Sequence, residues 1–326
     1  MGQKLKRAVA GLVAGLVFVV LMSVGGLVAF AIASPDQGSP GRCRLDPATM
    51  TAHPCTLVRS DTGSSVDPEP LWGSIDCASD SRVSLVTSGG DPHRTATDMS
   101  QGNDDYRRVT VLDGDNVAGE RCELGRNERR YGSGGGDGTF QLYREGERRI
   151  TFASFRLPEG FPIGNSYFQT VLQMKQTQPS DNGSGIPVLA LQVTNGEWKL
   201  KHVDSPSGGT SETLWRAPAK TGVWVRIAMD VTYSQHTDEG SVKLYLDRNG
   251  DGDSLDASEQ SSAITSHTLK YETPDPDGAA NDTDGLAPGN SIPSHLRVGL
   301  YHDPSIECPA PSGCSVQVDN VQVVGP

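Results

Sequence analysis

From about Leu71 onward, the chain consists of short segments in which apolar and polar residues alternate, separated by clusters of Gly, Pro, Asn and Asp. Successive side chains of a strand point to opposite faces, so this alternation predicts half-buried β-strands. Many short strands with turn residues between them predict an all-β sandwich or barrel, built as one domain over residues 71–326. The expected strands are Phe168–Lys175, Val188–Thr194, Trp198–Val203, Trp224–Tyr233, Ser241–Asp247, His295–Tyr301 and Ser315–Val324.

The first 33 residues have the composition of an export segment. Lys4, Lys6 and Arg7 precede an uncharged stretch over residues 8–33. The sequence AIAS fits cleavage after Ala33 as a signal peptide, and the uncharged stretch is also long enough to anchor the chain in a membrane if it is not cleaved. In both cases we expect the remainder to be secreted or extracellular. Residues 34–70, rich in Pro, Ser, Asp and Gly, are expected to form a linker with one small disulfide loop.

Charge and cysteine content narrow the possible partners. The chain has 28 Lys and Arg against 40 Asp and Glu, and without its first 33 residues the balance is 25 against 40, a net charge of −15. This acidity disfavours nucleic acid as a partner, and it requires any site for an acidic polymer to be locally basic. We expect a monomer. Six cysteines in an exported chain predict disulfides, for which fifteen pairings are possible. Proximity in sequence favours Cys43–Cys55 and Cys308–Cys314, which would leave Cys77–Cys122.

Three strand-like segments, among them Gly119–Asn127, oppose a polar face to an apolar one. In His295–Asp303, the polar side holds His295, Arg297, Gly299, Tyr301 and Asp303. In Gly119–Asn127, Arg121 and Glu123 lie opposite Cys122 and Leu124. In Tyr167–Gln176, alternation sets Tyr167, Gln169, Val171, Gln173 and Lys175 against Phe168, Thr170, Leu172 and Met174. One such strand is ordinary sandwich surface, but three that carry cations, an amide and a phenol predict a sheet face that holds an extended sugar polymer.

These strands resemble motifs of the alginate-lyase and heparin-lyase-like polysaccharide lyases. Arg121-Cys-Glu123-Leu124 resembles the family's R-x-E-L strand, and Gln173-Met-Lys175 stands where the family has Q-x-H. LRVGLYHD is similar to its late K-x-G-x-Y strand, with Arg297 in place of the Lys. The resemblance implies a concanavalin A-like β-jelly roll of two antiparallel sheets over residues 71–326. It also implies β-elimination on a uronic-acid polysaccharide, with no cofactor required for the chemistry.

The resemblance further implies roles for individual residues. Arg121 and Gln173 would bind and neutralise the substrate carboxylate, a task that suits the bidentate fork of a guanidinium. Tyr301 would be the acid, and also the base if nearby cations favour its ionised form. Arg297 would supply that field, and Glu123 would orient Arg121. The candidate substrate-binding residues are Glu123, Arg297, Tyr143 and Arg144, of which the last two also fit a plain surface strand.

Lys175 departs from the family pattern, because the family has a histidine there. An ordinary lysine is protonated near pH 7 and can act as a base only if its pKa is strongly depressed. Two interpretations stay open: a lyase in which Lys175 supplies positive charge, or a non-catalytic carbohydrate-binding protein. His202 and His302 are further candidates for a base, although alternation turns both inward. A glycoside hydrolase would need two paired carboxylates, and Glu123 stands alone on a suitable face.

The segment Asp247–Glu259 carries a possible metal loop. Its oxygen-bearing residues recur at every second position: Asp247, Asn249, Asp251 and Asp253. This spacing matches the first half of an EF-hand loop, but the closing Glu259 comes one position late and the flanks look like strands. The sequence therefore predicts a hairpin stabilised by structural calcium or, alternatively, a solvated acidic turn.

Overall fold

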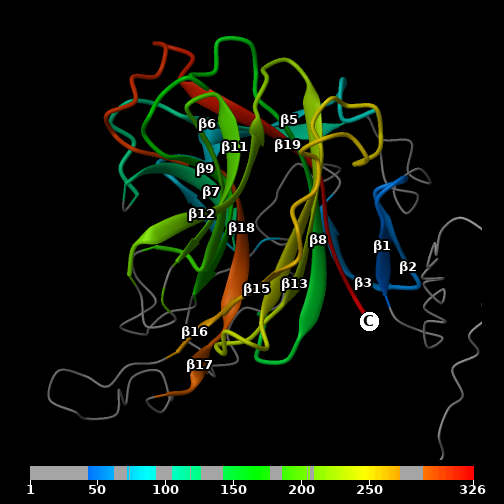
Figure 1. The fold of residues 1–326 in the computed structure, drawn as a ribbon. Coiled ribbons are helices and arrows are strands. Elements are labelled where there is room, and N and C mark those ends of the chain that lie inside the picture. The colour runs from blue at the N-terminus through cyan, green and yellow to red at the C-terminus, as the bar shows by residue number, and fades with distance from the viewer. Residues whose placement is uncertain are drawn as a thin grey trace, which may run out of the picture. The chain divides into compact units, whose positions relative to one another are not determined.

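Two antiparallel sheets packed face to face form the core of the protein. The computed structural model describes residues 43–61, 72, 74–92, 105–117, 119–125, 142–176, 186–203, 205, 209–271 and 289–326. Figure 1 shows the two layers from the side, with β18 in one layer and β8 in the other. The expected all-β sandwich is confirmed. The expected export segment lies outside the described residues, and among those described no helix is long and apolar enough to cross a membrane.

The first sheet has seven strands, and it includes the three strands expected to form a polar face. Its order is β12 (Ser211–Pro218), β11 (Glu197–Val203), β10 (Leu189–Thr194), β9 (Gln169–Gln176), β18 (Ser294–His302), β7 (Glu120–Gly125) and β4 (Ser74–Cys77). Strands β9, β18 and β7 are therefore adjacent in space although they are far apart in sequence.

The second sheet has eight strands. Its order is β15 (Ile264–Thr265), β14 (Ser241–Asp247), β13 (Trp224–Thr232), β8 (Arg148–Arg156), β19 (Cys314–Gly325), β6 (Tyr106–Val111) and β5 (Val83–Val86), with β3 (Thr56–Asp61) also paired to β19. Smaller elements are the hairpin of β1 (Arg44–Asp46) and β2 (Thr51–His53), the pair β16 (Lys270–Tyr271) and β17 (Ser291–Ile292), and a single 3-10 turn, η1 (Asp80–Arg82).

Alternation in β7 and β18 decides which side of the seven-stranded sheet faces the core. Cys122 and Leu124 of β7 pack inside with Leu296, Val298 and Leu300 of β18, as the sequence predicts. Fully burying one such aliphatic side chain stabilises the fold by about 1.5–3 kcal/mol. The intervening polar residues are thereby fixed on the opposite side of the sheet.

Strand β9 breaks its alternation at Val171. On the neighbouring strand β10, Leu191 pairs with Leu172 and the next residue, Gln192, pairs with Thr170, so Val171 has no partner there. Val171 packs in the core, as Leu172 does. Such a β-bulge inserts one extra residue and shifts the alternation of side chains beyond it.

Because of the bulge, the side chains of Thr170 and Phe168 lie on the face of the sheet opposite the core. Thr170 Oγ1 accepts a hydrogen bond of 3.0 Å from Gln192 Nε2. The ring of Phe168 meets the ring of Tyr301 edge-on, with centroids 5.0 Å apart. The expectation that Phe168 and Thr170 share the core side of this strand is therefore wrong.

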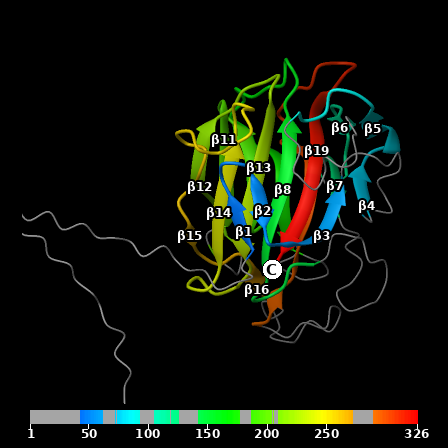
Figure 2. The ribbon, with the colours of Figure 1, turned by 90° about the vertical axis from the view of Figure 1, so that its right-hand side faces the viewer.

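Residues 43–61 belong to the folded domain, so the linker prediction is wrong for this part of residues 34–70. Strand β3 pairs with β19, and the β1–β2 hairpin packs Met50 against Ile150 and Phe152 on the outer face of the eight-stranded sheet. Figure 2 shows the hairpin lying over β8 and β13. The predicted small disulfide loop, Cys43–Cys55, is present here.

All three predicted disulfides are present. Cys77–Cys122 joins β4 to β7, and Cys308–Cys314 closes the loop before β19. Cys122 of the first disulfide lies between Arg121 and Glu123 on β7, and its side chain faces the core.

Candidate active site

The predicted catalytic residues meet on one face of the seven-stranded sheet. In the register of β18 with β9, Arg297 pairs with Gln173 and His295 with Lys175. In the register of β18 with β7, Tyr301 pairs with Arg121. Side chains of directly paired residues point to the same side of a sheet. We call this surface the polar face, and it carries Arg121, Glu123, Gln173, Lys175, His295, Arg297 and Tyr301.

Glu123 connects the groups of the polar face from beneath. Its side chain is 1% exposed, its Oε1 accepts a hydrogen bond from Gln173 Nε2, and its Oε2 lies 3.4 Å from Nη1 of both Arg121 and Arg297. A buried carboxylate is tolerated when cations and hydrogen-bond donors compensate it in this way. Glu123 therefore orients Arg121 and Gln173, and its burial argues against the predicted direct contact with substrate.

Arg297 is nearly buried, and its charge is balanced within the protein. Its Nη1 lies 2.7 Å from Asp76 Oδ2 on β4 and 3.4 Å from Glu123 Oε2. Its side chain is 4% exposed. The predicted role in binding substrate is not supported by this burial, and Arg297 acts instead as a support for its neighbours.

Tyr301 is held between a cation and a close stretch of backbone. Arg121 Cζ lies 3.9 Å from the centroid of the Tyr301 ring, within the range of a cation–π contact. A Cβ added at Gly119, whose φ is +107°, would lie 2.8 Å from Tyr301 Cε2. The missing side chain at Gly119 thus leaves room for the phenol ring.

Gly299 allows β18 to approach β7 beside this tyrosine. Its φ is +146°, and a Cβ built there would collide with the carbonyl oxygen of Cys122. Only glycine fits this position without strain. The glycine of the G-x-Y pattern therefore has a steric reason, which is the close packing of the two strands that carry Arg121 and Tyr301.

The pKa of Lys175 is lowered from 10.5 to about 8. Burial is the largest cause, followed by the positive charges of Lys270 and Arg121, while Glu123 opposes the shift. Lys270 itself is buried, its Nζ donates to the carbonyl oxygen of Ile186 at 2.7 Å, and burial lowers its pKa to about 8. A substantial fraction of Lys175 is therefore a neutral amine in mildly alkaline solution, which is the form that can accept a proton.

His295 belongs to the polar face, although the sequence alone indicated no role for it. It is 1% exposed, it is the cross-strand partner of Lys175, and its Nε2 lies 3.1 Å from Arg297 Nε. Since a guanidinium only donates, Nε2 is the acceptor and the imidazole is neutral with its hydrogen on Nδ1. The alternation of His295–Asp303 placed it correctly, but the pairing with Lys175 depends on a register that the sequence does not show.

The two histidines named as alternative bases do not reach the polar face. His302 Nε2 lies 3.4 Å from Cys308 Sγ in the interior, and His202 Nε2 lies 2.8 Å from the carbonyl oxygen of His267. Both are fully buried on the core side, as alternation predicts.

Tyr143 and Arg144 do not join the polar face. Tyr143 is 1% exposed and stacks on Tyr233 at 4.8 Å within the core, where burial raises the pKa of its phenol. Its prediction as a substrate-binding residue is wrong, because a bridge to Ser294 turns its ring inward beneath β18. Arg144 is exposed in the turn that leads into β8, and its contact with sugar stays a prediction.

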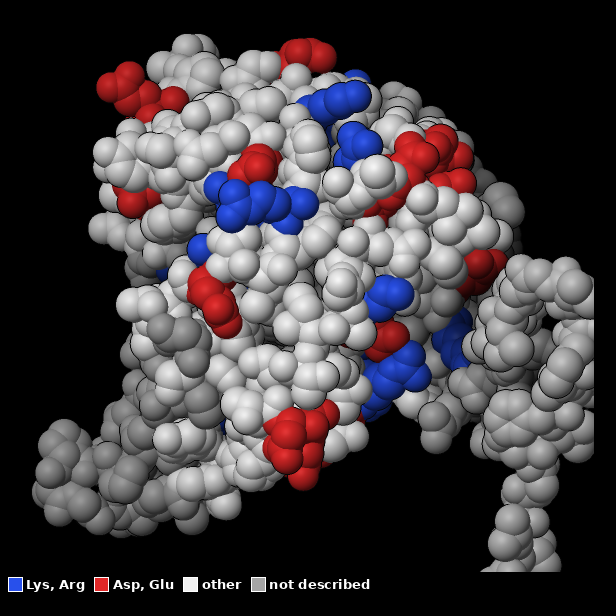
Figure 3. Space-filling view, viewed as in Figure 1, with Lys and Arg blue, Asp and Glu red and all other residues white. Residues whose placement is uncertain are grey.

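Figure 3 shows basic and acidic side chains interspersed over the face in view, with no continuous patch of either sign. On the face in view, an acidic polymer would therefore be attracted at short range by particular cations and not by a broad positive surface. Arg121 and Lys175 are two such cations on the polar face.

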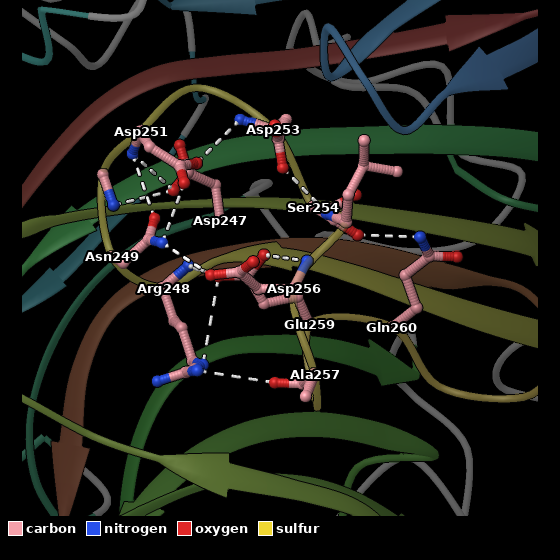
Figure 4. Close-up of polar contacts among 12 residues, drawn as sticks. Asp247, Arg248, Asn249, Asp251, Asp253, Ser254, Asp256, Ala257, Glu259 and Gln260 are labelled. Carbon is pink, nitrogen blue, oxygen red and sulfur yellow. Dashed lines mark hydrogen bonds and ion pairs between the residues drawn. The ribbon is translucent and has the colours of Figure 1, made fainter.

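The predicted calcium loop satisfies much of its own hydrogen-bonding capacity. Asp247 is buried, and its two carboxylate oxygens accept hydrogen bonds from the backbone N–H groups of Gly250, Asp251 and Gly252 at 2.7–3.2 Å. Asn249 Nδ2 donates to Asp251 Oδ2 at 2.9 Å. Figure 4 shows these contacts.

Glu259 closes the loop from inside. It is buried, and its oxygens accept from the backbone N–H groups of Arg248 and Asp256. Burial is the largest cause of the raised pKa of both Asp247 and Glu259. Hard oxygen donors of this kind suit Ca²⁺. A preformed metal site would bring at least three such ligand atoms within 4.8 Å of one another. Among the described residues, those of this loop do not meet that condition. Calcium binding therefore stays a prediction.

The two-sheet sandwich carries an arginine, an amide, a lysine and a tyrosine on one sheet face, as the resemblance to the polysaccharide lyases predicted. The family described as "Polysaccharide lyase" matches residues 71–321. The chain therefore belongs to the polysaccharide lyase family, as the sequence motifs indicated.

Two solved structures share the fold. The endo-beta-1,4-glucuronan lyase from the fungus Trichoderma reesei is 14% identical, with 83% of this chain and 96% of that chain covered and a TM-score of 0.52. The marine PL-14 alginate lyase from Aplysia kurodai is 13% identical, with 83% and 100% covered and a TM-score of 0.51. No curated protein sequence matches the chain significantly. At these identities the two structures support the jelly-roll fold alone.

Proposed function

We propose that this polysaccharide lyase is exported and cleaves a polymer of 4-linked uronic acid by β-elimination. The observation that carries the proposal is Lys175, which shares one sheet face with Arg121, Gln173 and Tyr301 and has a pKa of about 8. A lysine so perturbed can act as a base, which removes the objection raised by the absence of the family's histidine. Two of the solved structures that share the fold are lyases of glucuronan and of alginate, both uronic-acid polymers.

The first step is neutralisation of the substrate carboxylate. Arg121, whose side chain is 13% exposed, offers a guanidinium as the main contact, and the nearly buried amide of Gln173, held by its bond to Glu123, lies beneath it. Charge-assisted donors of this kind stabilise the extra negative charge that develops on the carboxylate when C5 loses its proton.

Proton transfer completes the reaction. The neutral amine of Lys175 takes the C5 proton, and the C5–H electron pair forms a double bond between C4 and C5. The C4–O4 bond breaks at the same time, and the phenol of Tyr301 protonates the leaving O4. The products are a new non-reducing end with an unsaturated uronate and a new reducing end, and the proton on Lys175 returns through solvent to Tyr301.

The test is ultraviolet absorbance of unsaturated uronate, measured with the purified protein and a panel of glucuronan, alginate and glycosaminoglycan polymers. We expect product from at least one polymer, with kcat/KM rising through pH about 8 as Lys175 loses its proton. A protein that binds a polymer but yields no unsaturated product would instead support the non-catalytic interpretation.

Variants of Lys175 separate a base from a fixed charge. Lys175→Arg keeps the charge but cannot be deprotonated, so it should lose activity by about 10²-fold or more. Lys175→His should retain activity and move the rise of kcat/KM toward pH about 6.5. Full activity in Lys175→Arg would show that position 175 supplies only positive charge.

A further inference from the structure

A continuous line of paired residues crosses the seven-stranded sheet from the catalytic tyrosine to its outer edge. The pairings of β7, β18, β9, β10, β11 and β12 place six residues in this row: Arg121, Tyr301, Thr170, Gln192, Lys199 and Arg216. A second row beside it joins Arg297, Gln173, Ala190, Lys201 and Thr213. Both rows begin among the residues of the candidate active site. The first reaches Lys199 on β11 and Arg216 on β12, and the second reaches Lys201 on β11.

The lysines of β11 face the same side as the catalytic groups. Trp198 and Leu200 of this strand are fully buried in the core. Lys199 and Lys201 alternate with them and are partly exposed, so they project from the polar face. Neighbouring strands lie about 4.8 Å apart, so β11 is roughly 14 Å and β12 roughly 19 Å from β18, which carries Tyr301.

Positive charge at this edge exceeds the acidic charge that contacts it. Glu197 Oε2 lies 3.4 Å from Lys199 Nζ and 3.7 Å from Arg216 Nη1, so one carboxylate serves two cations. Lys201 Nζ donates to Thr213 Oγ1 at 2.9 Å. Burial and the charges of Lys199 and Arg216 lower the pKa of Lys201, despite Glu212 nearby.

We propose that Lys199, Lys201 and Arg216 form an outer subsite for a second carboxylate of the same polymer. The proposal rests on the proposed function, and it specifies the substrate: a polyuronate that lies across the strands and carries carboxylates repeatedly along its length. A polymer with only one charged residue near the cleaved bond would gain nothing at this subsite.

The test compares a long polyuronate with a short oligosaccharide that is still cleaved. In Lys199→Ala/Lys201→Ala, we expect KM for the polymer to rise about five- to tenfold with kcat unchanged, in line with the loss of two partly exposed charge contacts. KM for the short substrate should stay the same. The KM of the variant for polymer should also depend less on salt concentration. The single variant Lys199→Ala should also raise KM for the polymer. Its matched control is Lys243→Ala on β14 of the other sheet, which should leave KM unchanged.

The subsite can be tested apart from catalysis. Retardation of each protein in a gel that contains the polymer measures binding without any reaction. Equal retardation of the wild type and the double variant would overturn the subsite, as would a KM that rises equally for long and short substrates. A wild type that yields no unsaturated product on any polyuronate would instead overturn the proposed function, and weaker retardation of the double variant would still support the subsite.

Discussion

The polar face and the loop Asp247–Glu259 use similar sequence patterns in opposite ways. In both, residues able to bind a ligand stand at every second position. On β18 the backbone is extended, so His295, Arg297 and Tyr301 share one side of a sheet. In the loop, Gly250 and Gly252 adopt φ values of +77° and +100°, so the chain turns back on itself and the carboxylates meet its own N–H groups.

The difference shows that alternation predicts a shared face only where the backbone is extended. On the polar face, the buried Glu123 contacts the side chains of Arg121 and Gln173 and fixes their orientation. In the loop, the buried carboxylates of Asp247 and Glu259 accept hydrogen bonds from the loop's own backbone N–H groups and so stabilise the turn. The following variants test whether the first region acts on substrate and whether the second only supports the fold.

The largest effect is expected from Tyr301→Phe. Loss of the phenolic oxygen removes the proposed acid, and general acid catalysis contributes about 10²–10⁴-fold, so kcat should fall by about 10³-fold. The melting temperature should hardly change, since the ring and its contacts with Arg121 and Phe168 stay. Release of unsaturated uronate measures the rate. Tyr245→Phe on β14 is the control, and activity equal to that of this control would exclude Tyr301 as the acid.

A smaller loss is expected from Glu123→Gln. The variant keeps the shape of the side chain but removes the charge that faces Arg121 and Arg297. We expect kcat/KM to fall about 10–10²-fold and stability to fall by about 2 kcal/mol, because a buried network loses its carboxylate. Kinetics and thermal unfolding measure the two effects. Glu147→Gln, which breaks a more exposed pair with Arg149, should cost less than about 1 kcal/mol. Unchanged kinetics in Glu123→Gln would leave Glu123 a purely structural role.

Lys270→Gln should shift a pH profile and leave the maximal rate unchanged. Removing this positive charge favours protonation of Lys175, so the rise of kcat/KM should move to higher pH, and the rate near pH 8 should drop about two- to threefold. A profile that does not move would show that Lys270 has no electrostatic effect on Lys175.

Stability should respond to the same two lysines. Folding lowers the pKa of both from 10.5 to about 8, so the unfolded chain binds more protons between these values and stability rises with pH across this window. Lys270→Gln should lose part of that rise, which chemical denaturation at pH 8 and pH 10 would measure.

The smallest effect is expected from calcium. The cation would relieve repulsion at the raised-pKa carboxylates Asp247 and Glu259, and we expect it to raise the melting temperature by about 2–4 °C, close to 1 kcal/mol. A chelator should reverse the shift, and Asp251→Asn should abolish it. No shift in the wild type would mean that the hydrogen bonds of the loop suffice.

The sequence predicted the fold class, the three disulfides and the faces of β7 and β18 correctly, because each depends on local alternation or on cysteine proximity. It failed where a partner strand decides the outcome. Tyr143 looked like surface until its bridge to Ser294 placed it in the core. The pairing of Lys175 with His295 depends on the register of β18 with β9. The effect of Lys270 on the pKa of Lys175 depends on where β16 lies. Neither can be predicted from a local sequence pattern.

The bulge at Val171 makes the backbone path of β9 as decisive as its residues. If a strand of the same length alternated without the bulge, either Thr170 or Gln173 would turn toward the interior. One end of the strand could then support the ring of Tyr301 through Phe168, or the other could present Gln173, but not both. A change that flattens the bulge at constant length is therefore expected to abolish activity even where every functional side chain is retained, whereas deletion of Val171 itself would leave Thr170 and Gln173 on the polar face.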